Sequence, residues 1–323
     1  MWQAAWRRLA QAALVVAIVA VATFALIHLA PGDPFSASLD DPRVAPAVRA
    51  HWRNVYGFDQ PLPVQFWRWT TSVARGELGY SFSQHRPVSE VVRATVPNTM
   101  QLMGTALVLS FALGVGLALV QSFRPGGWLD RSLGTATLVT WALPDFWLAL
   151  LMLLAFSYWL PWFPAGGMTA DVHDPYPLWW RLLDRMRHLV LPAGTLALLT
   201  AAQVARHQRV ALAHALADGF VRTARAKGAA PARVLLRHAW RAALLPVITQ
   251  LGVALPGLLG GAVFIETIFS WPGMGRVAID AIGARDYPLV MACVLTGAVL
   301  VAIGAAVADL LQQWADPRIR RVT

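Results

Sequence analysis

The chain has 323 residues, of which 57% are apolar and only 14% are charged. A soluble protein of this length could not bury so much apolar surface, so the composition indicates an integral membrane protein. The formal net charge of +10 does not make nucleic acid an expected partner, because the arginines lie at the ends of apolar stretches rather than on one polar face. The single cysteine, Cys293, excludes both an internal disulfide and a cysteine-based metal cluster.

The first predicted element is a transmembrane helix over residues 1–30. No Asp, Glu, Lys or Arg occurs between Arg8 and Asp33, and a helix of about 20 apolar residues is enough to cross the hydrocarbon core of a bilayer. This apolar stretch is too long for a cleaved signal peptide. We therefore expect a retained helix whose N-terminus lies inside the cell.

Residues 31–98 form a polar, tryptophan-rich segment that we expect outside the membrane. Within it, Arg43–Tyr56 and Pro61–Arg75 are predicted helices, and each is followed by a glycine that can end it, Gly57 or Gly76. We expect this segment to be mainly helical and to have a structural role.

Five further apolar stretches follow, which gives six predicted transmembrane helices and an all-α polytopic membrane protein. They cover residues 94–123, 132–160, 188–205, a stretch that ends before Glu266, and about 287–308. Prolines inside them, at positions 144, 192, 246 and 256, predict kinked helices. Lys and Arg are concentrated in the segments on the side of both termini, so these segments, including the tail 314–323, are expected in the cytoplasm.

The cytoplasmic loop over residues 206–243 is strongly basic and has a predicted local structure of its own. Asp218 is expected to cap a short helix by accepting hydrogen bonds from its free N–H groups. Gly228 is expected to end that helix in the left-handed conformation, and Pro231 to occupy the first turn of the next one. The pattern predicts a short basic helix, a tight corner and a second helix that runs into the membrane.

The sequence of this loop resembles that of a known family. The run RTARAKG, followed by RHAWRAALLP, is similar to the cytoplasmic signature loop of ATP-binding-cassette importer permeases, most closely of the branch that imports dipeptides, oligopeptides and nickel. HLAPGDP, YGFDQP, QFWRW, GELGYS, ExIFSWPGxG and ADPRIRR resemble further motifs of that branch, in the same order. Arg222, Thr223 and Ala224 replace the Glu-Ala-Ala opening of the broader superfamily, a departure that suits the peptide and nickel branch.

The resemblance implies a fold, partners and a mechanism. The fold is that of a type I importer permease in the inner membrane, with its transmembrane domain in residues 99–313, the first helix outside it and a periplasmic insertion over 31–98. The partners are a sibling permease, one or two ATPase subunits that hold ATP and magnesium, and an external substrate-binding protein. The short basic helix would couple ATPase motion to alternating access. Its docking candidates are Arg222, Thr223, Ala224, Arg225, Lys227 and Gly228.

Catalytic motifs are absent from the sequence. Lys227 is the only lysine and Gly228 follows it, so the phosphate-binding loop GxxxxGK[ST] is missing. HExxH and GxSxG are missing as well, and no acid stands at metal-ligand spacing beside His207, His214 or His238. We therefore expect neither an enzyme nor a cofactor or metal site in this chain, with ATP hydrolysed by separate subunits.

Asp145 is a candidate residue of the translocation pathway. It lies about halfway along the third predicted span, in WALPDFWLALL, where a carboxylate is costly unless it faces a partner or a water-filled passage. One hypothesis is that it meets the cationic end of a peptide. The alternative is a structural contact, or a helix that starts nearer the membrane surface than the sequence suggests.

Glu266 and the following TIFSWPGMG form the second candidate feature on the external side. Glu266 could line the pathway or pair with Arg276. Pro272, Gly273 and Gly275 are expected to preclude regular helix there and to form a compact turn at the outer mouth.

Two other classes of function compete with the importer permease. A stand-alone secondary transporter driven by protons or sodium would usually show internal repeats and several intramembrane acids, and this chain shows no convincing repeat. A membrane-embedded enzyme would need one of the missing motifs. The substrate stays open among dipeptides, oligopeptides, nickel chelates, opines and antimicrobial peptides.

Overall fold

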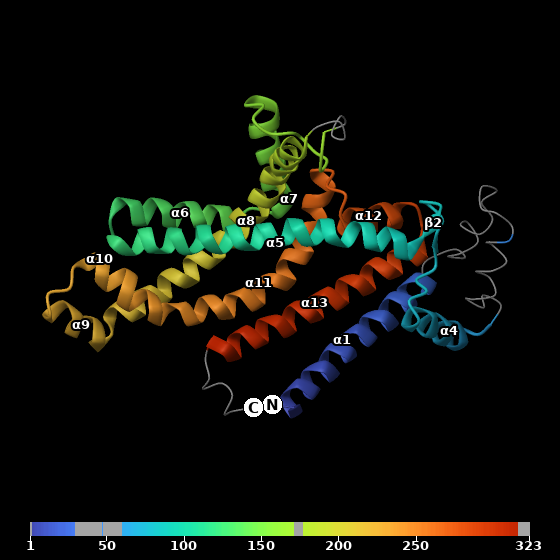
Figure 1. Ribbon diagram of the computed structural model, residues 1–323, viewed down its shortest axis with the longest axis horizontal. Coiled ribbons are helices and arrows are strands. Elements are labelled where there is room, and N and C mark those ends of the chain that lie inside the picture. The colour runs from blue at the N-terminus through green and yellow to red at the C-terminus, as the bar shows by residue number, and fades with distance from the viewer. Residues whose placement is uncertain (1, 30–46, 48–59, 171–176, 316–323) are drawn as a thin grey trace. The chain divides into compact units, whose positions relative to one another are not determined.

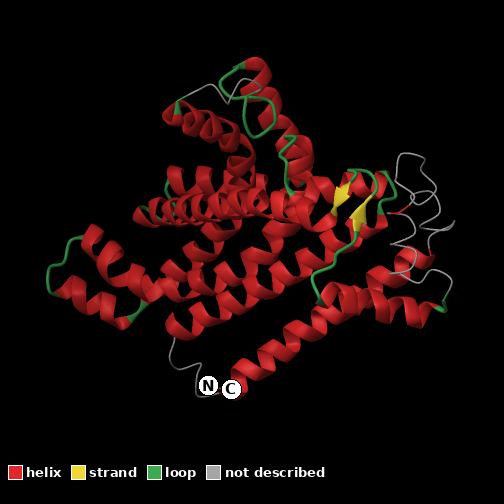
Figure 2. Cartoon of the chain, turned by 45° about the vertical axis from the view of Figure 1, so that its right-hand side comes forward, coloured by secondary structure: helices red, strands yellow, loops and turns green. Residues whose placement is uncertain are grey.

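The computed structural model describes residues 2–29, 47, 60–170 and 177–315, which are helical apart from turns and one short β pairing (Figure 2). The helix expected over Arg43–Tyr56 and nearly all of the tail lie outside the described residues. The chain divides into two compact units, one built from residues 1–99 and 272–303, the other from 100–271 and 304–323.

The first unit packs its helices around aromatic side chains. It contains α1 (Trp2–Leu29), α4 (Leu62–Ala74), the strands β1 (Tyr80–Ser81) and β2 (Arg86–Pro87), α12 (Met274–Gly283) and the first parts of α5 (Val88–Phe123) and α13 (Tyr287–Ala315). The ring of Phe24 lies 5.2 Å from that of Phe66 and 6.0 Å from that of Trp69, which joins α1 to α4. Gly76, at φ +85°, follows α4 and confirms the predicted end of this helix.

The second unit contains the remaining helices (Figure 1). They are α6 (Trp128–Ala142), α7 (Asp145–Leu153) with the π-helical turn η1 (Leu154–Trp159), α8 (Leu178–Ala217), α9 (Gly219–Ala226), α10 (Pro231–Arg233), the π-helical turn η2 (Val234–Ala239) and α11 (Trp240–Ile268). α8 and α11 lie side by side along much of their length. α5 also packs closely on α8, since a Cβ added at Gly114 would lie 2.7 Å from the Cβ of Val204.

The helices long and apolar enough to cross a membrane, among the described residues, are α1, α5, α8 and α13. The α6–α7 pair is a fifth candidate, but it is bent by 108°. The kink predicted at Pro144 is therefore confirmed, but it divides the span predicted over 132–160 into two helices. Leu143 and Pro144 are both extended, with ψ near 140°. The cause for Leu143 is the ring of Pro144, which disfavours the helical conformation of the residue before it.

The bounds predicted for the fourth span are also wrong, because α8 runs from Leu178 to Ala217 rather than over 188–205. Its first turns fall in the predicted external loop and its last turns in the predicted cytoplasmic loop. The predicted bounds were too short because an apolar stretch ends at the first charged residues, whereas the backbone hydrogen bonds of a helix continue through polar residues. The fifth predicted span, expected to end before Glu266, falls on α11, a helix of 29 residues that continues to Ile268 and is not among the candidate spans above.

Candidate functional site

The short basic helix α9 ends as the sequence predicts. Gly228 adopts φ +79°, its N–H donates to the carbonyl of Arg225 over 2.9 Å, and the N–H of Ala229 donates to the carbonyl of Ala224 over 3.1 Å. These two bonds form a Schellman motif, which satisfies carbonyls that the helix itself leaves free. Pro231 begins α10, also as predicted.

The cap predicted at the other end of α9 is only partly confirmed. Asp218 occupies the N-cap position in an extended conformation, but its side chain makes no capping hydrogen bond. Its carbonyl accepts the N–H of Val221 over 3.1 Å. The start of this helix is therefore stabilised by a backbone hydrogen bond and not by the carboxylate of Asp218.

α9 presents its charged side chains to solvent. Val221 is fully buried and holds the helix against the unit. The docking candidates Arg222, Thr223, Arg225, Lys227 and Gly228 are exposed, and Ala224 is half-buried. The helix can therefore offer a basic face to a partner without losing its own packing.

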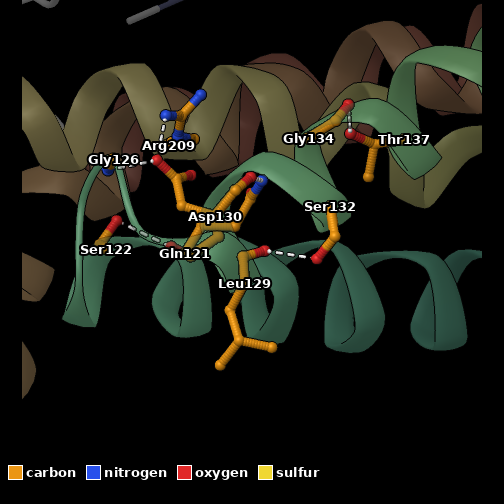
Figure 3. A network of polar contacts seen from close by, with 10 residues as sticks. Gln121, Ser122, Gly126, Leu129, Asp130, Ser132, Gly134, Thr137 and Arg209 are labelled. Atoms are coloured by element: carbon orange, nitrogen blue, oxygen red, sulfur yellow. Dashed lines mark hydrogen bonds and ion pairs between the residues drawn. The ribbon is translucent and has the colours of Figure 1, made fainter.

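A polar network that the sequence did not reveal joins the α5–α6 turn to α8 (Figure 3). Asp130 is 3% exposed. One oxygen of its carboxylate accepts from the guanidinium of Arg209 over 2.6 Å and from the N–H of Gly126 over 2.9 Å. The other oxygen is buried without a hydrogen-bond partner. Its only sequence signal was an acid within the basic turn RPGGWLDR.

Asp145 lies at the break between α6 and α7, not midway along a continuous helix. It is half-buried and lines a pocket of about 220 Å³ together with Trp141, Gln203 and Leu258. This geometry keeps the pathway hypothesis open, because the carboxylate borders a cavity. α7 begins at Asp145. The two alternatives, a structural contact and a helix start nearer the membrane surface, stay predictions.

A larger pocket of about 710 Å³ opens beside the first and shares Trp141 and Gln203 with it. The guanidinium carbon of Arg206 lies 4.8 Å from the centre of the Trp141 ring. The sequence placed His207 and His214 in a loop, but both lie on α8 and line this pocket. Nδ1 of His207 lies 2.9 Å from the carbonyl oxygen of Gln203.

Glu266 is fully buried near the end of α11, and its carbonyl accepts the N–H of Trp271 over 2.8 Å. The pathway role of Glu266 and its pairing with Arg276 both stay predictions. A turn follows at Ser270, which adopts φ +51°.

The predicted role of Gly275 in the turn is wrong, whereas Pro272 and Gly273 precede helix α12 as expected. Gly275 lies in the first turn of α12, where N–H groups need no partner within the helix. The hydroxyl of Thr99 accepts the N–H of Met274 over 2.8 Å, and the amide of Asn98 donates to the carbonyl of Pro272 over 2.8 Å.

Asp286 is a second buried acid that the sequence did not single out. It precedes α13 and is 1% exposed. One oxygen of its carboxylate accepts from the hydroxyls of Ser81 and Ser83, over 2.6 Å and 2.7 Å, and from the N–H of Ser83 over 2.9 Å. This carboxylate fixes the β1 strand to the start of α13.

No cluster of three or more His, Cys, Asp or Glu side chains suited to a metal ion occurs in the described part of the chain. The polar groups brought together are instead a basic helix, two buried carboxylates with their donors, and a pair of adjoining pockets. These arrangements can dock a partner or bind a charged solute, but they assemble no nucleophile with a base.

Comparison with known proteins gives matches along nearly the whole chain. Residues 110–321 match the model of the family described as binding-protein-dependent transport system inner membrane component, and residues 1–103 match the model of its N-terminal part. The oligopeptide transport system permease protein AppB of Bacillus subtilis is 36% identical over 302 residues, covering 93% of this chain and 94% of the relative.

Two further relatives show the same extent of similarity. The di/tripeptide transport system permease protein DppB of Pseudomonas aeruginosa is 38% identical, with 94% of each chain covered. The probable D,D-dipeptide transport system permease protein DdpB of Escherichia coli is also 38% identical, with 95% of this chain and 94% of the relative covered.

A solved structure is similar in fold. A chain of the MetNI methionine ABC transporter, in an inward-facing conformation, aligns with a TM-score of 0.53 at 18% identity and covers 72% of this chain and 96% of that one. At this identity the likeness concerns the fold alone.

Proposed function

Because the chain belongs to the binding-protein-dependent transport system inner membrane components, we propose that it is the permease subunit of an ATP-driven importer of peptides. Such a component is a membrane-spanning permease and not an enzyme. Its fold is that of the type I importer permeases. The observation that carries the peptide assignment is the 36–38% identity to three peptide permeases over at least 93% of this chain.

The partners follow from this role. A permease of this class works with ATPase and substrate-binding subunits. In our proposal a sibling permease completes the transmembrane pathway, and one or two ATPases bind ATP and magnesium. The substrate-binding protein delivers the peptide from outside, and both termini of this chain lie in the cytoplasm.

The coupling helix in this proposal is α9. Its exposed face carries Arg222, Arg225 and Lys227, while Val221 anchors it to the unit. A contact can couple two proteins only if it favours one of their states over the other. The rigid end at Gly228 supports this function, because a fixed corner passes on displacement that a flexible loop would absorb.

The translocation pathway in this proposal runs along the two adjoining pockets beside α8. Asp145 borders the smaller pocket, and an intramembrane acid is favourable only where water or a charged partner reaches it. Glu266 is assigned to the same pathway at its outer end, near the turn formed by Pro272 and Gly273. The competing secondary transporter has no such support, since the family acts with binding proteins.

Co-purification tests the proposed function. The tagged chain is extracted in mild detergent, and every retained protein is identified by mass spectrometry. We expect a second permease and one or two ATPases that carry a phosphate-binding loop. A chain that emerges alone, monodisperse and stable, would contradict the proposal and favour the secondary transporter.

Charge reversal assigns the ATPase contact to α9. Arg222→Glu combined with Arg225→Glu should release the ATPases and retain the sibling permease. The matched control is Arg124→Glu, which reverses an exposed charge on the α5–α6 turn and should retain both. Loss of the sibling permease in the double variant would point to misfolding rather than to a lost contact.

A further inference from the structure

A polar stripe on α8 faces polar side chains of α11. Thr200, Gln203, His207 and His214 recur at three-, four- and seven-residue steps, so they share one side of the helix. All four line the two adjoining pockets, as does Gln250 of α11. Thr200 and Gln203 fall within the predicted span 188–205, where polar side chains face cavities or other helices because lipid cannot satisfy their hydrogen bonds.

The two pockets carry opposite charges. The smaller one has the carboxylate of Asp145 on its wall, and the larger one has the guanidinium of Arg206. Trp141 and Gln203 line both pockets, so the pockets adjoin and the two charged groups lie to either side of these shared residues. Neither charge forms an ion pair with another side chain of the described residues.

The guanidinium of Arg206 lies over an aromatic ring in a position that leaves it able to bind a ligand. It stacks over the Trp141 ring at 4.8 Å, and such stacking fixes the plane of the guanidinium while its N–H groups stay free at the edge. A guanidinium in this state can take a carboxylate with two parallel hydrogen bonds. Asp145, in the other pocket, can accept an ammonium group.

We propose that the two adjoining pockets together bind a peptide by its two charged ends, with Arg206 on the C-terminal carboxylate and Asp145 on the N-terminal ammonium. The inference rests on the proposed function and deepens it, since it limits the substrate to peptides with free termini. The larger pocket, of about 710 Å³, lies within the size range of pockets that enclose small ligands. Gln203, shared by both pockets, offers its amide to the peptide backbone between the ends.

Protection of a cysteine in the larger pocket tests the inference on the assembled transporter. Val210→Cys, in a Cys293→Ala background, places a reactive thiol at an exposed position that lines this pocket. The rate of maleimide labelling is measured without binding protein, in the presence of trialanine, N-acetyl-trialanine or trialanine amide. Trialanine should protect, and each blocked peptide should need a concentration about tenfold higher, as expected for one lost hydrogen bond to a charged group.

Substitutions assign the two ends. In Arg206→Gln, trialanine and trialanine amide should protect equally, and N-acetyl-trialanine should still protect less than trialanine. In Asp145→Asn, trialanine and N-acetyl-trialanine should protect equally, and trialanine amide should still protect less. Arg206→Lys should keep a preference for the free carboxylate, and Arg124→Gln, outside the pockets, should behave as the parent. If Arg206→Gln weakens all three peptides alike, Arg206 binds something other than the carboxylate, such as a lipid phosphate, and the inference fails.

If the Arg206→Gln variant does not assemble, the protection assay on the protein with Arg206 intact still tests the inference. Equal protection by trialanine and its amide, or none by either, overturns the inference. If cells still accumulate labelled trialanine in that case, only the inference about the two pockets fails, and the proposed function as a peptide importer is retained. A parent chain that neither co-purifies with ATPases nor supports uptake contradicts the proposed function itself.

Discussion

Asp130 joins parts of the chain that lie 79 residues apart, through its 2.6 Å contact with Arg209. Asp130→Asn keeps the shape of the side chain and removes its charge. We expect the free energy of unfolding to fall by about 1.5–3 kcal/mol, the usual contribution of hydrogen bonds to charged groups. The half-exposed guanidinium can turn to water, which keeps this loss below that of a fully buried pair.

A double-mutant cycle checks this prediction. The thermal midpoint of the detergent-solubilised transporter is compared for Asp130→Asn, Arg209→Gln and the double variant. Because the two side chains share one interaction, the double variant should lose less than the sum of the single losses. Additive losses would show that Asp130 stabilises the turn through Gly126 alone.

Asp286 is the second acid whose loss should destabilise the protein. Asp286→Ala removes the acceptor shared by Ser81 and Ser83 and leaves the buried hydroxyl of Ser81 without it, at a cost of about 2 kcal/mol or more. The matched control is Asp280→Ala, whose carboxylate is 65% exposed and 3.8 Å from Arg276; such surface pairs contribute little. Equal thermal midpoints for the two variants would contradict the structural role of Asp286.

At the scale of the element, a substitution at Gly228, in the corner after α9, should act through the backbone conformation alone. A Cβ added at Gly228 meets nothing within 4 Å, but the backbone there has φ +79°. The penalty for Gly228→Ala is therefore conformational, about 1 kcal/mol, and should be larger for Gly228→Val. We expect a weaker stimulation of ATPase activity by peptide-loaded binding protein in both variants.

Gly219→Ala is the matched control for the corner. Gly219 begins the same helix, also has open space at its Cβ position, and lacks a positive φ. Alanine there favours the helix, so stimulation should be retained. Gly228→Asn should also retain most of it, because asparagine tolerates the left-handed conformation. Full stimulation in Gly228→Val would exclude a mechanical role for this corner.

The elements that the sequence predicted correctly depend on neighbouring residues. The end of α9 at Gly228 and the start of α10 at Pro231 follow from local backbone preferences. The kink at Pro144 was also predicted from a local preference, but the size of the bend, 108°, was not. Helix bounds then failed wherever polar residues continue a helix, as in α8.

The residues that the sequence missed depend on distant partners. Asp286 meets Ser81 across 205 residues, and no local pattern specifies such a contact. The same holds for the pocket that brings Trp141 of α6 beside Gln203 and Arg206 of α8. Packing of separate helices creates these neighbourhoods, so only the folded chain can show them.

At the scale of the whole molecule, the distribution of Lys and Arg predicts the orientation in the membrane. The turn at Arg124 should lie in the cytoplasm and the segment at Glu77 outside, and both side chains are exposed. Cys293 is buried, and Cys293→Ala supplies a background without cysteine. Glu77→Cys should react with a membrane-impermeant maleimide in intact spheroplasts, and Arg124→Cys only in inverted vesicles.

Each preparation contains its own control for this orientation. The parent chain, with Cys293 alone, should stay unlabelled in both, because its thiol is buried. Denaturant should then expose every cysteine to the reagent and give equal total labelling. The reverse pattern, with Arg124→Cys labelled from outside, would place α9 on the side without ATP. An ATPase could not reach the coupling helix in that orientation, so this result would contradict the importer proposal independently of any substrate.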